Sequence, residues 1–194
     1  MKIGLFFGSY NPIHIGHLAI ANYFVEYTDL QKLWFVISPQ SPFKTKKTLL
    51  PEIQRYNMVF SAVEDDNRFK ACNIEFNLPK PSYTIDTLSY LKEKYPDYEF
   101  SIIMGADNIL NFHKWKNYKI IAENYNIYVY KRPGIDLSLY ENNKKIHIVD
   151  APQIEISASF IRKAITEKKD IRYFLHKNVW NYIDEMNLYK KLLY

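Results

Sequence analysis

The chain has 194 residues, 47% of them hydrophobic and 24% charged, which is the balance of an ordinary globular protein with a sizeable core. Its 26 basic and 21 acidic residues give a net charge of +5, which suits a site for small anions and leaves at most a weak nucleic-acid-binding face. With no signal-like leader, no long apolar stretch and one cysteine, the protein is expected to be cytoplasmic, neither exported nor membrane-spanning.

Apolar runs and helical segments alternate along the chain. The apolar runs predict six strands, at 2–7, 32–38, 68–76, 99–105, 126–131 and 145–150. Between and after them, helices are predicted at 15–27, 51–63, 83–95, from 106 to about 125, 159–167 and 179–188. In the first helix, one apolar side is expected to consist of Leu18, Ala19, Tyr23 and Tyr27.

The strand pattern indicates the fold class. The strands are apolar throughout rather than alternating, which is expected when helices cover both faces of a sheet. Their separation by helices indicates parallel βαβ units with right-handed crossovers. We therefore expect one α/β domain over 1–194, with a Rossmann-like doubly wound parallel sheet, helices on both faces and a small closing helical part at 157–194. Ligands of such sheets bind beyond the carboxyl ends of the strands.

The loop after the first strand reads "GSYNPIHIGH", residues 8–17, with two histidines around a glycine. A zinc site needs three or four ligands, and the other histidines and the lone cysteine lie in no comparable setting, so we predict no protein-bound metal. The next helix begins near Ile15, which puts His14 and His17 beside free backbone N–H groups that attract anions. Gly16 leaves room for a phosphate to approach. Two structural histidines remain the alternative.

A second element, "ISASFIRKAI" at 156–165, predicts a helix with an apolar face formed by Ile161, Ala164 and Ile165. Ser157 or Ser159 can cap its start. Arg162 then falls near the positive end of the helix dipole, where a cation is disfavoured unless an anion binds at the same end. An exposed arginine without a ligand would also tolerate this position.

These two elements resemble the (H/T)xGH and ISxSxIR signatures of the HxGH nucleotidylyltransferase superfamily. The first is equally similar to the HIGH sequence of class I aminoacyl-tRNA synthetases, but the chain has no KMSKS loop and no room for an anticodon-binding domain. The resemblance implies that ATP binds here, with Mg²⁺ held through its phosphates. It also implies that an incoming oxyanion attacks the α-phosphorus and that pyrophosphate leaves, without a covalent enzyme intermediate.

Further stretches narrow the resemblance. "PSYTIDTL" (81–88) predicts a helix from about Thr84, with Ile85, Leu88 and Leu91 inward and free N–H groups that could hold a carboxylate. "GADNILNFHKW" (105–115) follows the fourth strand. Together with "SPFK" (41–44) and "YKRPG" (130–134), these stretches resemble the bacterial nicotinate-nucleotide adenylyltransferase family over nearly the whole chain.

The resemblance implies specific roles for residues of this sequence. The catalytic residues, which hold the ATP phosphates, would be His14, His17, Lys44 and Arg162. The wider ATP site would add Gly8, Ser9, Tyr10, Gly16, Gly105, Asp107, Arg132, Ile156, Ser157 and Ser159. The nicotinate nucleotide would contact Lys44, Tyr83, Thr84, Asp107 and Trp115, with its carboxylate on the Tyr83–Thr84 backbone and its ring on Trp115. Arg55 is a lesser candidate.

Simpler roles remain open for several of these residues: a core aromatic for Tyr83 or Trp115, a helix cap for Asp107 and a solvated loop lysine for Lys44. The first loop also departs from the family, because it reads "GSYNPIH" where many relatives have "GGTFDPIH". Asn11 in place of aspartate removes one negative charge beside the phosphates, which is expected to leave the chemistry intact.

The expected reaction is transfer of AMP from ATP to nicotinate mononucleotide, giving deamido-NAD and pyrophosphate. A helix N-terminus favours the carboxylate of this acceptor over the neutral amide of nicotinamide mononucleotide. Adenylyltransferases acting on nicotinamide mononucleotide or phosphopantetheine, a cytidylyltransferase, and a non-catalytic nucleotide- or RNA-binding module remain alternatives. We expect the two small substrates as partners, no nucleic acid and no membrane, and leave a homo-oligomer open.

Overall fold

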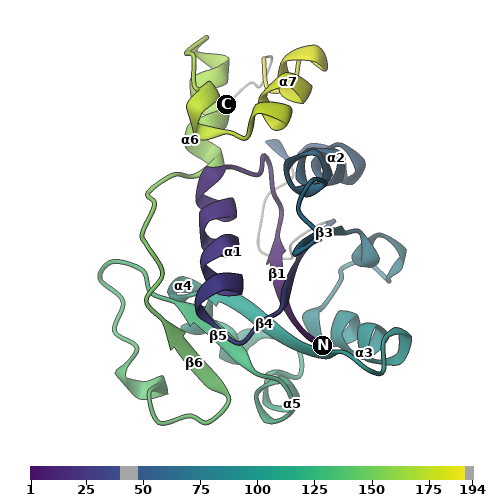
Figure 1. Cartoon of the computed structure of the whole chain (residues 1–194), viewed down its shortest axis with the longest axis vertical. Coiled ribbons are helices and arrows are strands. Elements are labelled where there is room, and N and C mark those ends of the chain that lie inside the picture. Colours follow the sequence, from purple (N-terminus) through teal and green to yellow (C-terminus); the bar gives the residue numbers. More distant parts are fainter. Residues whose placement is uncertain (40–47, 191–194) are drawn as a thin grey trace.

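The computed structural model describes residues 1–39 and 48–190. Within them, six strands form one sheet in the order β3-β2-β1-β4-β5-β6, and every neighbouring pair runs parallel. The strands are β1 (Lys2–Gly8), β2 (Lys32–Ile37), β3 (Phe69–Cys72), β4 (Glu99–Gly105), β5 (Ile127–Tyr130) and β6 (Ile146–Val149). This strand order is that of a doubly wound Rossmann-like sheet, so the predicted α/β fold class is confirmed (Figure 1).

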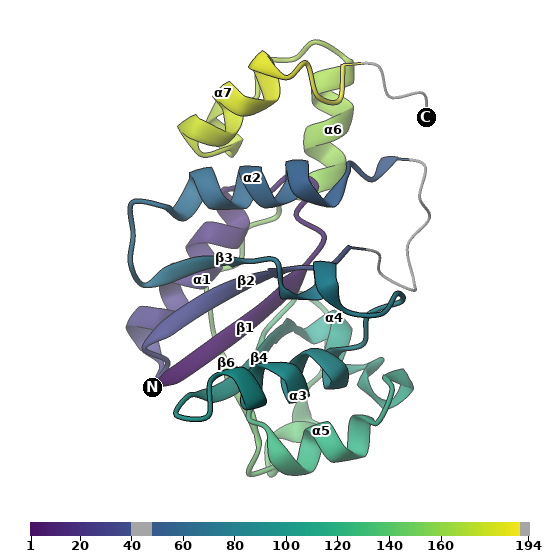
Figure 2. The same cartoon turned by 90° about the vertical axis from the view of Figure 1, so that its right-hand side faces the viewer.

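Helices cover both faces of the sheet. They are α1 (Ile15–Tyr27), α2 (Glu52–Val63), α3 (Thr84–Lys94), α4 (Ala106–Ile109), α5 (Tyr118–Asn124), α6 (Ala158–Thr166) and α7 (Lys177–Glu185). Figure 2 shows α2 on one side of the sheet, with α6 and α7 stacked beyond it, and α3 and α5 on the other side. In the part of the chain that the structure describes, no helix combines the length and apolar character needed to cross a membrane.

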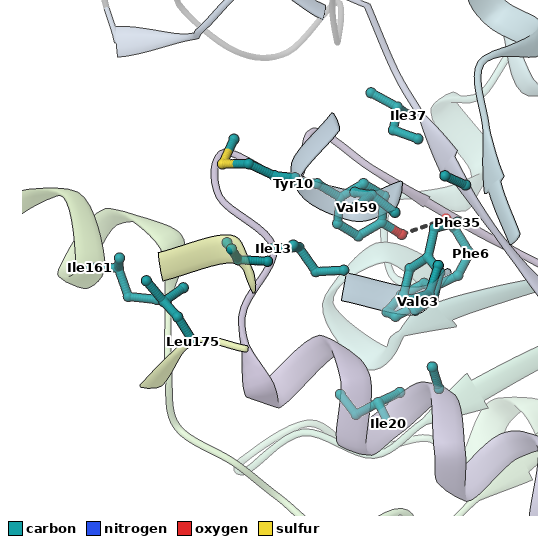
Figure 3. Close-up of a cluster of buried hydrophobic side chains, with 14 of the residues drawn as sticks. Phe6, Tyr10, Ile13, Ile20, Phe35, Ile37, Val59, Val63, Ile161 and Leu175 are labelled. Carbon is teal, nitrogen blue, oxygen red and sulfur yellow. Dashed lines mark hydrogen bonds between the residues drawn. The ribbon is translucent and has the colours of Figure 1, made fainter. Parts of the chain in front are cut away.

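Two hydrophobic cores lie on the two faces, because successive side chains of a strand point to opposite sides. In β1, Leu5 belongs to the core beneath α3, α4 and α5, whereas Phe6 belongs to the core beneath α1 and α2. The core beneath α1 and α2 continues into the C-terminal helical part, since Ile161 and Leu175 belong to the same cluster as Phe6 (Figure 3). The C-terminal part between residues 157 and 190 therefore shares a core with the sheet and with the loop that follows β1.

Two predicted elements differ from the structure. The strand predicted at 68–76 ends at Cys72, and Ile74–Asn77 form a 3₁₀ turn instead. Here the chain bends so that the buried Glu75 carboxylate accepts hydrogen bonds from hydroxyl groups further along the chain. The helical stretch predicted from 106 to about 125 is broken into α4, a 3₁₀ turn at Phe112–Lys114, and α5.

The predicted inner side of α1 is wrong. The helix buries Gly16, Ile20, Ala21 and Phe24, whereas Tyr27 is 72% exposed. Residues 15–25 are apolar nearly all round the helix, so their spacing does not select one face. The inward faces predicted for α3 and α6 are confirmed, because the predicted residues of both helices are buried.

Candidate functional site

A cavity of about 570 Å³ opens at the carboxyl ends of β1 and β4, where the strand order switches direction. Apart from the lesser candidate Arg55, its walls contain every predicted site residue that the structure describes: Gly8, Ser9, Tyr10, His14, Gly16, His17, Tyr83, Thr84, Gly105, Asp107, Trp115, Arg132, Ile156, Ser157, Ser159 and Arg162. Lys44 lies outside the described residues. The fold thus gathers residues separated by up to 154 positions into one site.

The loop after β1 is held by a buried tyrosine. Tyr10 has a positive φ of 45°, an unfavourable conformation for a residue with a side chain, and is 2% exposed. Its hydroxyl donates a hydrogen bond to the carbonyl of Phe6 (Figure 3). The Asn11–Pro12 peptide that follows is cis. Tyr10 thereby anchors the loop to the strand that carries it and leads the chain to His14 at the start of α1.

The two histidines lie against each other at the N-terminus of α1. Their ring centroids are 3.7 Å apart, and the backbone N–H of His14 donates to Nδ1 of His17 over 3.3 Å. His14 is 6% exposed, and its Nδ1 has no hydrogen-bond partner among the described residues. Burial, assisted by the positive charge of Arg132, lowers the pKa of His14 to about 4. His14 is therefore a neutral, incompletely bonded imidazole at neutral pH.

Gly16 keeps this pair open to the cavity. A Cβ at position 16 would lie 3.1 Å from Nδ1 of His14, closer than ordinary van der Waals contact. A side chain here would crowd the buried Nδ1 of His14, which has no hydrogen-bond partner among the described residues. The predicted need for a glycine at this position is thus explained by access to His14 as well as to the helix end.

Arg162 reaches the same cavity from α6, which Ser157 caps by accepting a hydrogen bond from the backbone N–H of Phe160 over 3.1 Å. Nη1 of Arg162 donates to the carbonyl of Asn11 over 2.8 Å, and Nη2 donates to Oγ of Ser159 over 3.2 Å. Nε is buried and has no partner among the described residues. A buried donor without an acceptor is costly, so a ligand oxygen is the partner that this arrangement suits.

The ends of β4 and β5 carry two further polar side chains, Asp107 and Arg132. Arg132 lies with Nε 3.7 Å from Oδ1 of Asp107, and its Nη2 donates to the hydroxyl of Tyr130 over 3.3 Å. A Cβ at Gly105 would lie 2.5 Å from Oδ1 of Asp107 and 3.1 Å from the hydroxyl oxygen of Tyr130, so the glycine leaves room for these two side chains. The Asp107 side chain is 59% exposed and faces water as well as the arginine. Both groups are therefore available to a polar ligand.

The opposite end of the cavity is aromatic and lies at the N-terminus of α3, where Tyr83 is the N-cap and Thr84 the first helical residue. The ammonium group of Lys116 lies 4.6 Å from the centroid of the Tyr83 ring. Trp115 is half-buried and packs edge-on against Phe112, with centroids 5.5 Å apart. A flat ring carrying an anionic group suits this combination of aromatic surface and helix N-terminus.

Arg55 does not line the cavity. It is fully buried and donates hydrogen bonds to four backbone carbonyl groups, those of Ser9, Ser38, Pro39 and Leu50. These carbonyls belong to the loops that follow β1 and β2. Arg55 therefore fixes the loops that form the cavity and makes no contact inside it.

Glu75 is a cavity residue that the sequence analysis missed. It is 2% exposed, and its two carboxylate oxygens accept hydrogen bonds from the hydroxyls of Ser82 (2.9 Å) and Thr87 (2.8 Å). None of the described residues forms an ion pair with it. Burial outweighs these hydrogen bonds and raises the pKa of Glu75. Its signal in the sequence is an acidic residue inside the apolar run "CNIEF", shortly before "PSYT".

The raised pKa of Glu75 predicts a pH-dependent stability. The folded protein holds this proton more tightly than the unfolded chain, so the associated stability is present below pH 4.5 and is lost as pH rises through the higher folded-state pKa. Glu75→Gln removes this loss and is expected to gain stability relative to wild type as the pH rises from 4.5. Urea unfolding at several pH values measures the difference, with the exposed Glu141→Gln as the matched control. Parallel pH curves for wild type and Glu75→Gln would contradict it.

Among residues 1–39 and 48–190, no group of three or more His, Cys, Asp or Glu side chains is arranged to hold a metal ion. The carboxylates of Glu75 and Asp107 also line the cavity, but the groups gathered around the N-termini of α1 and α6 are the imidazoles of His14 and His17 and the guanidinium group of Arg162. A guanidinium group stays protonated and is not a metal ligand, and imidazoles, guanidinium groups and helix N-termini all bind oxyanions.

Comparisons with known proteins agree with the geometry. A family model described as "Cytidylyltransferase-like" matches residues 5–164. A relative from Flavobacterium johnsoniae named "Probable nicotinate-nucleotide adenylyltransferase" is 53% identical over 193 residues, covering 98% of this chain and 100% of the relative. A relative of the same name from Bacteroides thetaiotaomicron is 46% identical over 186 residues, covering 95% of this chain and 92% of the relative.

The fold is also shared with a solved structure. "Plasmodium falciparum nicotinic acid mononucleotide adenylyltransferase complexed with NaAD" superimposes with a TM-score of 0.81 at 23% sequence identity, covering 97% of each chain. At this identity the likeness concerns the fold. It extends over the C-terminal helical part as well as the sheet.

Proposed function

Because the chain belongs to the cytidylyltransferase-like family and is about half identical to nicotinate-nucleotide adenylyltransferases over nearly its whole length, we infer that it is a nicotinate-nucleotide adenylyltransferase. It transfers AMP from ATP to nicotinate mononucleotide and releases pyrophosphate, giving deamido-NAD. The observation that carries this conclusion is one cavity that combines His14, His17 and Arg162 with the aromatic, anion-attracting end at Thr84 and Trp115.

We propose that the histidine and arginine end of the cavity binds the ATP phosphates. An oxygen of the acceptor's phosphate forms a bond to the α-phosphorus, and the bond from that phosphorus to the bridging oxygen of the β-phosphate breaks. The electron pair leaves with pyrophosphate. Donors fixed beforehand and aimed at the phosphate oxygens stabilise the charge that develops in this step. Nδ1 of His14 and Nε of Arg162, which have no partner among the described residues, are proposed to be such donors.

Mg²⁺ is proposed to enter with ATP rather than to reside on the protein. The cavity's cationic and imidazole groups suit phosphate oxygens, and a Mg²⁺ ion carried on the phosphates would neutralise part of their charge. Gly105 and Asp107, at the end of β4, and Arg132, just after β5, are proposed to contact the adenosine part of ATP. By the family resemblance, Lys44 is proposed to contact the phosphates of both substrates.

At the other end of the cavity, the first-turn N–H groups of α3, at Thr84, are proposed to receive the nicotinate carboxylate. A helix N-terminus interacts more favourably with a carboxylate than with a neutral amide. Trp115 is proposed to stack on the pyridine ring, with Tyr83 beside it. This end is the part of the site that would distinguish nicotinate from nicotinamide mononucleotide.

The acceptor is tested by pyrophosphate release with ATP and Mg²⁺ and with nicotinate mononucleotide, nicotinamide mononucleotide or phosphopantetheine as acceptor. Fast release is expected with nicotinate mononucleotide, and little with the other two. CTP in place of ATP is expected to support little reaction. Release with another acceptor alone would contradict the roles of Thr84 and Trp115, and release with CTP alone would contradict the ATP site.

Direct transfer of AMP from ATP to the acceptor predicts that no covalent AMP–enzyme intermediate forms. Incubation with radiolabelled ATP and Mg²⁺, without acceptor, is expected to leave no label on the denatured protein. A stably nucleotidylated protein that passes its label to nicotinate mononucleotide would show a two-step route instead.

A further inference from the structure

The segment after α7 returns to the loop that follows β1. Tyr189 is 3% exposed, and its hydroxyl donates a hydrogen bond to Oδ1 of Asn11 over 3.0 Å. Its φ is +63°, in the left-handed region that disfavours residues with a Cβ. Such a conformation persists where the surrounding contacts fix it, and it often marks a functional part of a structure.

The backbone of Tyr189 is fixed as well. Its carbonyl accepts a hydrogen bond from Oγ1 of Thr166, at the end of α6, over 3.1 Å. Burial raises the pKa of the Tyr189 phenol well above its ordinary value, so the hydroxyl remains a proton donor at any working pH. The tyrosine thus joins α6 to the loop after β1 through two hydrogen bonds of fixed direction.

Both the oxygen and the nitrogen of the Asn11 side-chain amide form hydrogen bonds. Besides accepting from Tyr189, Oδ1 accepts from the backbone N–H of Leu50 over 3.3 Å, and Nδ2 donates to the carbonyl of Thr48 over 2.8 Å. The residue is 4% exposed. Its orientation is therefore set by the C-terminal segment and by the chain at 48–50 together.

The backbone carbonyl of Asn11 is the acceptor that holds Nη1 of Arg162. With Nη2 held by Ser159, two of the three guanidinium nitrogens are fixed, and Nε is left as the buried donor that faces no protein acceptor in the described chain. A change in the Asn11 peptide would turn the guanidinium group and move Nε. Two hydrogen bonds therefore connect the Tyr189 hydroxyl to a group in the cavity.

We propose that Tyr189 is a positioning residue for ATP: its hydroxyl fixes Asn11, and Asn11 fixes the guanidinium group of Arg162 for the phosphates. This inference rests on the proposed function in one respect, namely that Arg162 binds ATP. It gives the C-terminal segment a part in substrate binding in addition to its share of the hydrophobic core.

The variant Tyr189→Phe removes the hydroxyl and keeps the ring. Its matched control is Tyr182→Phe, because the Tyr182 hydroxyl, on α7, is also hydrogen-bonded, to Nδ2 of Asn57 over 3.2 Å, and lies outside the cavity lining. Both variants are expected to fold, with similar small losses in Tm. Tyr189→Phe alone is expected to raise the KM for ATP, by about fivefold, the effect of one hydrogen bond, while kcat and the KM for the acceptor change little.

The route through Arg162 has its own test. In an Arg162→Ala background, Tyr189→Phe is expected to cause no further rise in the KM for ATP, because the group that it positions is gone. An equal KM for ATP in Tyr189→Phe and Tyr182→Phe would overturn the proposal, and so would a full fivefold effect in the Arg162→Ala background.

Binding of a non-hydrolysable ATP analogue, measured by calorimetry, separates this inference from the proposed function. If wild type binds the analogue but does not adenylylate nicotinate mononucleotide, the assigned acceptor is wrong, and the comparison of Tyr189→Phe with Tyr182→Phe still decides the role of Tyr189. Equal affinities in those two variants overturn it, and a selective loss in Tyr189→Phe supports it.

Discussion

Alanine substitution of either His14 or His17 is expected to lower kcat/KM for ATP by about 10²–10³-fold, the usual cost of removing one donor from a site that stabilises developing charge. The two rings lie in contact at the N-terminus of α1, and the backbone N–H of His14 donates to His17. Removing either ring therefore disturbs the orientation of the other. Steady-state kinetics at saturating nicotinate mononucleotide give the value for each variant.

The matched control is His147→Ala. His147 stacks on Tyr128 at the edge strand β6, with ring centroids 4.8 Å apart, and is absent from the cavity lining. It is expected to retain the wild-type kcat/KM. Values for His14→Ala and His17→Ala within about threefold of this control would show that the histidines are structural, since that difference corresponds to less than one hydrogen bond.

The pH dependence of this loss follows from the buried state of His14. A kcat/KM profile reports ionisations of the free enzyme, in which the pKa of His14 is about 4. The ratio of wild-type to His14→Ala activity is therefore expected to stay constant between about pH 6 and pH 8, because the imidazole acts in its neutral form. A ratio that falls through an ionisation near pH 6.5 would contradict this.

The same pKa shift has a consequence for stability. The folded protein binds the His14 proton more weakly than the unfolded chain does, so the associated stability is complete above pH 6.5 and is lost as the pH falls towards 4. The free energy of unfolding is thus expected to fall over the same pH range in which His14, at the end of the loop after β1, becomes protonated.

Local patterns predicted much of the fold and of the site. The order of strands and helices follows from apolar runs separated by helical periods, and Ser157 caps α6 as its position before an apolar stripe indicates. Motif residues such as His14 and Arg162 could be assigned to one cavity because the loops after parallel strands meet at one edge of the sheet.

The rest depends on contacts between distant parts of the chain. Glu75 and Arg55 are buried charges whose partners are hydroxyls and carbonyls supplied by other elements, and no local spacing indicates such partners. Comparison with the family's aspartate predicts that Asn11 lies beside the phosphates. Its side-chain amide instead binds Thr48 and Tyr189, the latter 178 positions away. An aspartate could not donate the bond to the Thr48 carbonyl, so the amide has a structural reason in this chain.

Loss of the buried Arg55 side chain is expected to lower the stability of the protein strongly. Arg55→Met would leave the carbonyls of Ser9, Ser38, Pro39 and Leu50 without the donor that they share. With a buried acceptor costing about 1–3 kcal/mol when it is left unpaired, and with partial access of water, a loss of about 3 kcal/mol is expected. For a chain of this size, that corresponds to a fall in Tm of about 6–12 °C.

Two further variants separate this effect from a general loss of charge. Arg172→Met removes an exposed arginine paired with Asp170, and is expected to leave Tm almost unchanged. Arg55→Lys keeps the positive charge, but a single ammonium group cannot reach four carbonyls arranged for a planar guanidinium group, so its Tm is expected between those of Arg55→Met and wild type.

A Tm for Arg55→Met equal to that of Arg172→Met would show that the loops after β1 and β2 hold their shape without the buried arginine. A full loss in Arg55→Met with recovery in Arg55→Lys would assign the effect to charge. The expected graded series instead assigns it to the number and direction of the hydrogen bonds that Arg55 donates beneath the cavity.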